Sequence, residues 1–259
     1  MSLFFSCPRK GQPATHAWCG LVALMGALCC RPVLTTRQVV VGFQGLFAGV
    51  AHMHSKGLVD QDLHPGNILL SSDRSALVKA DLGNAVPKQV DGIPNWRGHI
   101  MCCAGTESPQ VAETFLEQGR YKPLFRSGVW ALGLVMLEVV GGRKPQQHLD
   151  VLSSQEYLEE LSDEERGDPS DPDEAPGQYH HLKYLSDKLT DAAQPDYADE
   201  VTFPPWLQGL PDSPEAELQS IIRGCLRVHS EDRCKSEVVC LRLHSMMLKY
   251  GWSSSMLDT

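Results

Sequence analysis

Three polar residues in the first third of the chain have the types and the spacing that a phosphoryl-transfer site requires. Asp62 and Asn67 stand five residues apart around a Pro-Gly turn, and Asp81 follows an apolar stretch and precedes Leu82-Gly83. In phosphoryl transfer one carboxylate must orient the attacking hydroxyl, while an amide oxygen and a second carboxylate hold Mg²⁺ against the nucleotide phosphates. The same residue types also favour turns, and Asp62 and Asn67 alone would be interpreted as turn residues.

A long helix is expected to lead the chain into this turn. Thr35 followed by Gln38 fits a capping box, and Lys56-Gly57 supplies a stop with a glycine that tolerates the left-handed conformation. Between them apolar residues recur at helical spacing, which predicts a helix of about five to six turns packed on one face. The apolar positions are Val39, Phe43, Leu46, Phe47 and Val50.

Short strands are expected beside the turn. Apolar segments lie around Leu58-Val59, at Ile68 to Leu70 and at Leu77 to Ala80, and Ser71-Ser72-Asp73 separates the last two. From Asn84 to about Gln110 the prolines and glycines predict a loop without regular structure.

The second half of the chain predicts three further helices. Val129 to Val140 is almost wholly apolar and is followed by Gly141-Gly142, which indicates a helix buried on most sides. Ser213-Pro214 begins the next one, with Ser as the cap and Pro in the first turn, and Ser236 to Lys249 forms the last. The predicted fold class is mainly α with short β-hairpins.

The negative charge of the chain is concentrated in one stretch. The 259 residues have a formal net charge of -9, and residues 151 to 174 hold ten Asp or Glu against one basic residue, Arg166. The rest of the chain therefore sums to about zero, which argues against a nucleic-acid partner and gives no support for an anionic membrane partner. Residues 151–177 are expected to be a disordered acidic insertion.

The cysteines and an apolar N-terminal segment bear on where the protein is found. The nine cysteines lack paired metal-ligand spacing, so reduced thiols and a cytoplasmic location are expected. Residues 17 to 30 form an apolar run of fourteen, shorter than the roughly 20 residues of a membrane-spanning helix. We expect a buried or partner-facing helix there, and a cleaved signal sequence and an acylated or membrane-associated segment stay as alternatives.

Three separate segments resemble one family, the eukaryotic protein kinases. Val59 to Leu70, with Asp81-Leu82-Gly83, resembles the catalytic loop and the Asp-Phe-Gly element. Gly105 to Glu113 is similar to the end of the activation segment, and Cys225 to Arg233 is similar to a Cys-Leu segment that ends in an Arg. The resemblance covers roughly residues 35 to 250 and implies the fold of a protein-kinase C-lobe.

The resemblance also implies a contact between two distant residues. In the family the activation-segment Glu pairs with the Arg of the later segment, which corresponds to Glu113 and Arg233 here. Such an ion pair is largely buried, and removing one partner would leave an uncompensated charge that costs about 3 to 5 kcal/mol. With these residues in register, the interpretation of Asp62 and Asn67 as mere turn residues loses most of its weight.

Site roles are implied position by position. Asp62 would be the catalytic base that accepts the proton of the substrate hydroxyl, and Asn67 and Asp81 would be Mg²⁺ ligands. Leu69 would form part of the floor under the adenine of ATP. His64 stands where such loops commonly carry Lys, and it would either donate a hydrogen bond to the transferred phosphoryl group or be an exposed turn residue without a role.

The implied activity is phosphorylation of protein Ser or Thr with ATP and Mg²⁺ as cofactors. Thr106 occupies the position that indicates the Ser/Thr-like branch. The partner would be a protein substrate or another protein, with no nucleic acid and no membrane span.

Several positions depart from the family pattern. Asp60 and Gln61 replace the His and the Arg that precede the catalytic Asp, and the loss of the Arg removes the cation that would bind a phosphorylated activation loop. Gly128 stands where the central helix normally begins with an Asp that hydrogen-bonds the catalytic loop. Its loss should loosen that loop, and misplacement by about 1 Å can cost about 100-fold in rate.

The residues before Asp62 contain neither a Gly-x-Gly-x-x-Gly loop nor an apolar strand that carries Lys. We therefore expect a C-lobe over residues 35–250 that lacks a complete N-lobe, after an apolar segment or hinge-region remnant at 1–34 and before a tail at 251–259. Three functions fit: a truncated Ser/Thr kinase, a non-catalytic pseudokinase that binds partners, and a small-molecule kinase of the aminoglycoside or choline type. The downstream segments favour the protein-kinase branch over the third.

Overall fold

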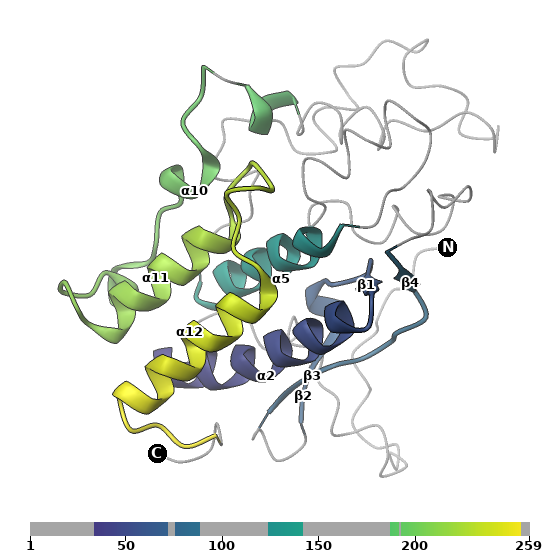
Figure 1. Cartoon of the computed structure of the whole chain (residues 1–259). Coiled ribbons are helices and arrows are strands. Elements are labelled where there is room, and N and C mark those ends of the chain that lie inside the picture. The colour runs from purple at the N-terminus through teal and green to yellow at the C-terminus, as the bar shows by residue number, and fades with distance from the viewer. Residues whose placement is uncertain (1–33, 72–75, 89–123, 142–186, 192, 255–259) are drawn as a thin grey trace, which may run out of the picture.

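The computed structural model describes residues 34–71, 76–88, 124–141, 187–191 and 193–254, and the helices among them make up most of the described fold (Figure 1). The expected N-terminal segment 1–34, apart from its last residue, and the expected acidic insertion 151–177 lie outside these residues. The mainly helical class with short antiparallel strands is confirmed.

Helix α2 (Thr36–Ser55) leads into the candidate site and has the predicted ends. The Thr35 side chain accepts a hydrogen bond from Gln38 N, and Gln38 Oε1 accepts one from Thr35 N at 2.9 Å. At the other end Gly57 has a φ of 73°, a conformation that glycine adopts without steric cost. The capping box and the glycine stop are therefore confirmed.

Two small antiparallel pairs of strands follow α2. Strand β1 (Leu58–Asp60) pairs with β4 (Ala85–Pro87), and β2 (Ile68–Leu70) pairs with β3 (Leu77–Lys79). The first three strands were predicted, but the prediction of irregular structure from Asn84 onward was wrong over β4. Pro87 is tolerated because it is the last residue of an edge strand, where a missing N–H is least costly.

Three longer helices follow in the part of the chain that the structure describes. Helix α5 spans Phe125–Val139, α11 spans Pro214–Cys225 and α12 spans Ser236–Lys249, and the four-residue α10 (Tyr197–Glu200) precedes α11. The Ser213 side chain accepts from Ala216 N, so the predicted cap of α11 is confirmed. Helix α5 begins four residues before the predicted start at Val129. The prediction was late because the N-cap residue, Leu124, makes no side-chain capping bond, so the sequence carries no signal for the start of the helix.

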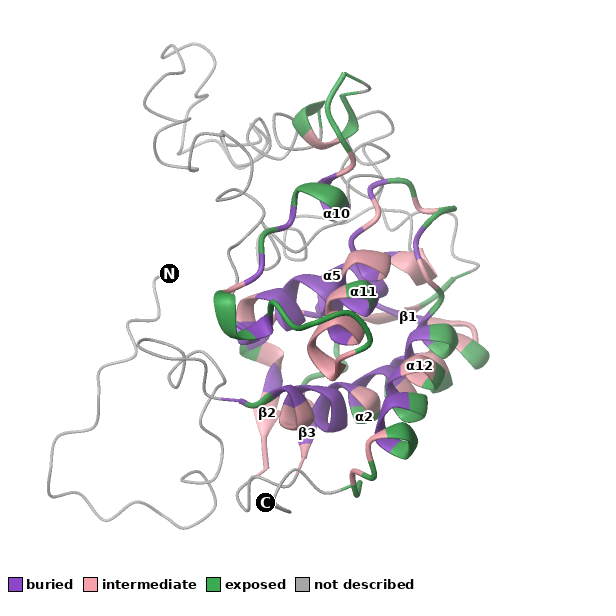
Figure 2. Cartoon of the chain, turned by 90° about the vertical axis from the view of Figure 1, so that its left-hand side faces the viewer, coloured by how far each residue is buried: buried purple, intermediate pink, exposed green. Residues whose placement is uncertain are grey.

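The hydrophobic core lies between these helices. Helix α12 packs along α2, and α5 packs against both α11 and α2. In Figure 2 α5 is buried over nearly its whole length, as its apolar sequence predicted, and its Trp130 is 1% exposed. Phe43 and Phe47 of α2 are fully buried in the same cluster. The core therefore holds α2 and the strands that follow it against α5.

Two helical glycines are expected to respond oppositely to substitution by Ala. A Cβ on Gly133 in α5 would lie 2.6 Å from Cys225 Cβ, whereas a Cβ on Gly45 in α2 would meet nothing within 4 Å. We expect Gly133→Ala to lower the free energy of unfolding by about 1–3 kcal/mol through overpacking. Gly45→Ala should raise it by about 0.5–1 kcal/mol through helix propensity.

Urea unfolding of both glycine variants beside the wild type would measure these changes. A Gly133→Ala protein as stable as Gly45→Ala would contradict the close approach of α5 and α11.

Candidate active site

The backbone brings the predicted site residues to one place. Asp62 lies two residues after the end of β1, and Asn67 ends a 3-10 turn, η1 (Pro65–Asn67). Asn67 O accepts a hydrogen bond from Ala80 N at 2.8 Å, which ties the turn to the end of β3, one residue before Asp81. The structure therefore places the backbones at Asn67 and Asp81 side by side, as a shared metal site requires.

Asp62 and Asn67 are joined by their side chains. Asn67 Nδ2 donates to Asp62 Oδ2 at 2.7 Å and to the Asp62 main-chain O at 3.1 Å. Asp62 is 6% exposed, so these bonds compensate a largely buried carboxylate. They also fix the amide of Asn67 with its nitrogen toward Asp62 and its oxygen away from it.

His64 lies against Asp62 and is not an isolated surface residue. Its Nδ1 accepts from Gly66 N at 3.1 Å, so in the neutral ring the proton is on Nε2. That nitrogen lies 3.4 Å from Asp62 Oδ1, and the side chain is 24% exposed. His64 can thus orient the carboxylate of Asp62 or present its N–H at the mouth of the site.

Asp81 occupies a sharp, solvent-facing turn. Its φ is 54°, a left-handed conformation that is uncommon for residues other than glycine. Its Oδ1 accepts from Gly83 N at 2.9 Å, and the residue is exposed. The turn therefore presents the carboxylate to solvent.

Asn84 is a site residue that the sequence interpretation missed. Its Nδ2 donates to Asp62 Oδ2 at 3.1 Å. It reaches Asp62 because β4 pairs with β1 in the register Asp60↔Ala85. The only sequence signal was an Asn placed directly after the Asp-Leu-Gly element.

The turn that carries Asp62 rests on α5 through an apolar contact of Leu63. Leu63 is 3% exposed, and its Cδ1 lies 3.0 Å from the position that a Cβ on Gly128 would take. An Asp at position 128 would need Leu63 to move. Leu63 thus packs over Gly128 and fills the space beside the turn. An Asp at position 128, which the family pattern would place there as a polar anchor, is replaced by this apolar contact.

The remaining predicted residues are only partly described. Leu69 is half-buried on β2, opposite Val78, and its role under adenine stays a prediction. Glu113 and Thr106 lie outside the described residues, so the ion pair with Arg233 also stays a prediction. Arg233 itself is 2% exposed, as such a pair would require.

The donor set suits Mg²⁺ better than a metal held by protein alone. Within the described segments no group of three or more His, Cys, Asp or Glu could hold a metal ion. Mg²⁺ prefers oxygen ligands, and it is commonly bound by one or two protein side chains together with substrate phosphates. Asn67 Oδ1 and the Asp81 carboxylate are oxygen donors of this kind.

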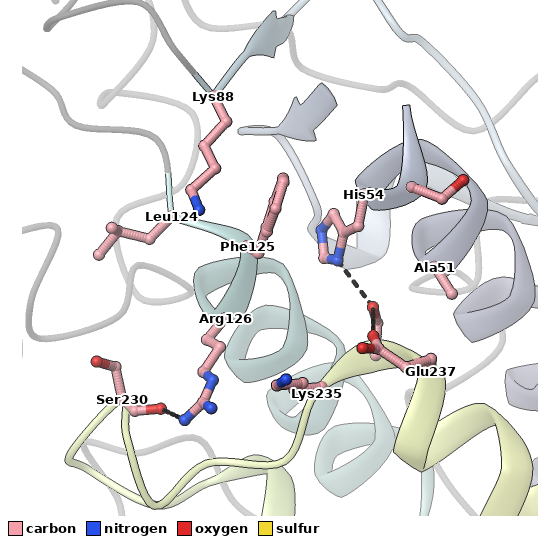
Figure 3. Close-up of a pocket in the computed structure, with 11 residues that line it drawn as sticks. Ala51, His54, Lys88, Leu124, Phe125, Arg126, Ser230, Lys235 and Glu237 are labelled. Atoms are coloured by element: carbon pink, nitrogen blue, oxygen red, sulfur yellow. Dashed lines mark hydrogen bonds between the residues drawn. The ribbon is translucent and has the colours of Figure 1, made fainter. Parts of the chain in front are cut away.

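A separate cavity of about 690 Å³ lies between the end of α2, the start of α5 and the residues around the start of α12 (Figure 3). His54 lies at its wall, with Nδ1 2.8 Å from Ser236 Oγ and its ring stacked on Phe125 at 4.6 Å. Burial lowers the pKa of His54 to about 4, against the opposing charge of Glu237. The ring is therefore neutral at physiological pH.

His54 should make the protein less stable in mild acid. An unfolded His has a pKa near 6.5. As pH falls from about 6.5 to 4, the unfolded chain takes up a proton that the folded chain refuses, so stability is lost over that window. With a discount for the partial exposure of the ring, we expect a loss of about 1 kcal/mol at pH 5.

Thermal unfolding at pH 7 and pH 5 would measure this effect. The difference between the two pH values should be smaller in His54→Gln than in the wild type, and equal differences would assign the acid sensitivity to other groups.

The sequence comparisons place the chain in a known class of phosphoryl-transfer proteins. The model of the protein kinase domain matches residues 21–244. Because this match covers well over half of the chain, the chain belongs to the protein kinase family. The alternative of a small-molecule kinase finds no support in this assignment.

Several curated proteins that the chain resembles are named as serine/threonine-protein kinases, one of them as inactive. The chain is 28% identical over 196 residues to the serine/threonine-protein kinase ssp1 of Schizosaccharomyces pombe, over 74% of this chain and 29% of that protein. It is 30% identical over 128 residues to the inactive serine/threonine-protein kinase PLK5 of Mus musculus, over 49% of this chain and 20% of that protein. It is also 30% identical over 122 residues to the maternal embryonic leucine zipper kinase of Xenopus laevis, over 47% of this chain and 18% of that protein. The chain thus spans less than a third of the length of these relatives.

Among the helices that the structure describes, none has the length and apolar character needed to cross a membrane.

Proposed function

We propose that this chain is a Ser/Thr-type protein kinase domain that binds ATP with Mg²⁺ and transfers a phosphoryl group to a protein hydroxyl. The main support is the orientation of Asn67. Both bonds from its Nδ2 go to Asp62, which leaves its Oδ1 for a metal ion on the other side. The hydrogen-bonded pair thus holds Asp62 as the base and Asn67 as a metal ligand in a fixed orientation to each other.

Each residue has a distinct task in this proposal. Asp62 accepts the proton of the substrate hydroxyl through Oδ1, because Oδ2 is held by Asn67 and Asn84. His64 Nε2–H stabilises the same oxygen before substrate arrives. Asn67 and Asp81 would hold Mg²⁺, which when bound supplies positive charge against the nucleotide phosphates. The natural substrate would be a protein with an accessible Ser or Thr.

Binding of the nucleotide tests this proposal without requiring turnover. At a free MgATP concentration 100 times its Kd, the wild type should gain about 2.7 kcal/mol of stability. We expect Asp81→Ala to lose most of that gain, because it removes a metal ligand from an exposed turn without disturbing the core. Thermal unfolding with ATP, with Mg²⁺ and with both would measure it. No shift of the wild type at millimolar MgATP would rule out the enzyme function for this chain.

A non-catalytic, partner-binding pseudokinase is the second candidate. Its support is the replacement of two adjacent residues before the base: Asp60 is 5% exposed and Gln61 is 7% exposed, so both substitutions lie in the interior of the catalytic turn. One of the relatives is also named inactive. This candidate predicts that the folded wild type transfers no phosphoryl group to any Ser- or Thr-containing peptide in a mixed library.

A further inference from the structure

Asp60 and Lys79 form an ion pair beneath the candidate site. Lys79 Nζ lies 3.3 Å from Asp60 Oδ2, and their side chains are 12% and 2% exposed. The two residues belong to different strand pairs, since Asp60 ends β1 and Lys79 ends β3. Burying two charges is costly unless their remaining hydrogen-bonding groups are also used.

Both ends of the pair contact the backbone of a predicted site residue. Asp60 Oδ1 accepts from Asp62 N at 2.9 Å. Lys79 Nζ donates to the main-chain oxygens of Ala80 and Asp81. A continuous path of polar contacts therefore runs from the base, through Asp60 and Lys79, to the metal ligand.

The contact at Asp81 falls on a strained turn. A φ of 54° is uncommon for a residue other than glycine, and it persists only where its surroundings determine it. The ammonium of Lys79 binds the carbonyl of that same residue. It thereby favours the turn that presents the Asp81 carboxylate to solvent.

We propose that Asp60 and Lys79 are positioning residues that lock the base Asp62 and the metal ligand Asp81 into one arrangement. This inference rests on the proposed function for its catalytic meaning. Asp60 stands where the resemblance places a His, so this chain uses an ion pair at a position where an imidazole was expected. The departure at position 60 is therefore compensated by Lys79.

Lys79→Met tests the proposal because it removes the charge and keeps the length of the side chain. We expect the Kd for MgATP to rise about 10-fold or more, the range seen when residues that orient metal ligands are removed. We also expect the amides of Asp62 and Gly83 to exchange with solvent at least about 10-fold faster, while the core amide of Phe47 changes less. Phe47 reports global opening, so only a local loosening gives this difference.

Lys249→Met is the matched control, because Lys249 pairs with Glu217 at 2.9 Å on the surface, away from the site. This variant should change neither the Kd for MgATP nor the exchange rates of the Asp62 and Gly83 amides. If Lys79→Met fails to fold, the double variant Asp60→Asn/Lys79→Met removes both charges and leaves no unpaired one. That variant should still bind MgATP about 10-fold more weakly and exchange Gly83 faster, because nothing holds the Asp81 carbonyl.

The two readouts separate the proposals. Suppose that the wild type binds MgATP and that Lys79→Met has the same Kd and the same amide exchange rates. This result would overturn the positioning role and leave the proposed function intact. A wild type that binds no MgATP would overturn the proposed function, and the exchange at Asp62 and Gly83 would still decide whether the pair orders the turn.

Discussion

We expect Asp62→Asn to slow phosphoryl transfer about 100- to 10,000-fold, the range that a positioned general base contributes. The carboxamide can still accept bonds from Asn67 and Asn84, so the turn should keep its shape. It cannot accept the proton of a hydroxyl near neutral pH. Because Asn67 and Asp81 are unchanged, the stabilisation by MgATP should stay close to that of the wild type.

Initial rates with labelled ATP and a mixture of Ser and Thr peptides would measure the loss, with thermal shifts as the test of binding. Asp199→Asn is the control: Asp199 is an exposed carboxylate on α10 that pairs with Arg227 at 2.8 Å. Its rate should stay within about twofold of the wild type. Equal rates for Asp62→Asn and the wild type would contradict the role of the base, and binding without transfer by the wild type would favour the pseudokinase.

The helices could be predicted because their signals are local in the sequence. The Thr35–Gln38 capping box and the Ser213-Pro214 start lie within four residues of the bonds they make. The turn at Asp62 was predictable for the same reason. Helix α5 was placed four residues late because neither Leu124 nor the residues after it form a side-chain cap.

The contacts that complete the site join segments that lie apart in the sequence, so they could not be predicted from local patterns. Asn84 reaches Asp62 only because β4 pairs with β1, and the Lys79 side chain reaches Asp60 from the other strand pair. A charged residue in the short apolar strand Leu77–Lys79 was a signal that a buried partner should be sought. Asp60, an acidic residue in place of an expected His, was its partner.

Loss of Arg233 should cost the fold much of its stability. Arg233 is 2% exposed, and its guanidinium donates to the main-chain oxygens of Arg126 at 3.0 Å, Arg227 at 2.9 Å and Val228 at 2.9 Å. It also lies over the Trp130 ring at 5.0 Å. One side chain thus joins the start of α5 to the segment before α12.

We expect Arg233→Met to lower the free energy of unfolding by about 3–5 kcal/mol, because one buried and two part-buried carbonyls lose charge-assisted bonds. Burial lowers the pKa of Arg233 to about 10, so the group is still charged at neutral pH. Arg233→Lys should recover only part of the loss, since an ammonium cannot match the planar fork of donors. Urea unfolding would measure both, with the more exposed, ion-paired Arg227→Met as a control that changes stability by about 1 kcal/mol or less. Equal stability of Arg233→Met and Arg227→Met would contradict the prediction that the Arg233 guanidinium holds α5 to the segment before α12. It would also remove the support that the burial of Arg233 gives to the predicted ion pair with Glu113.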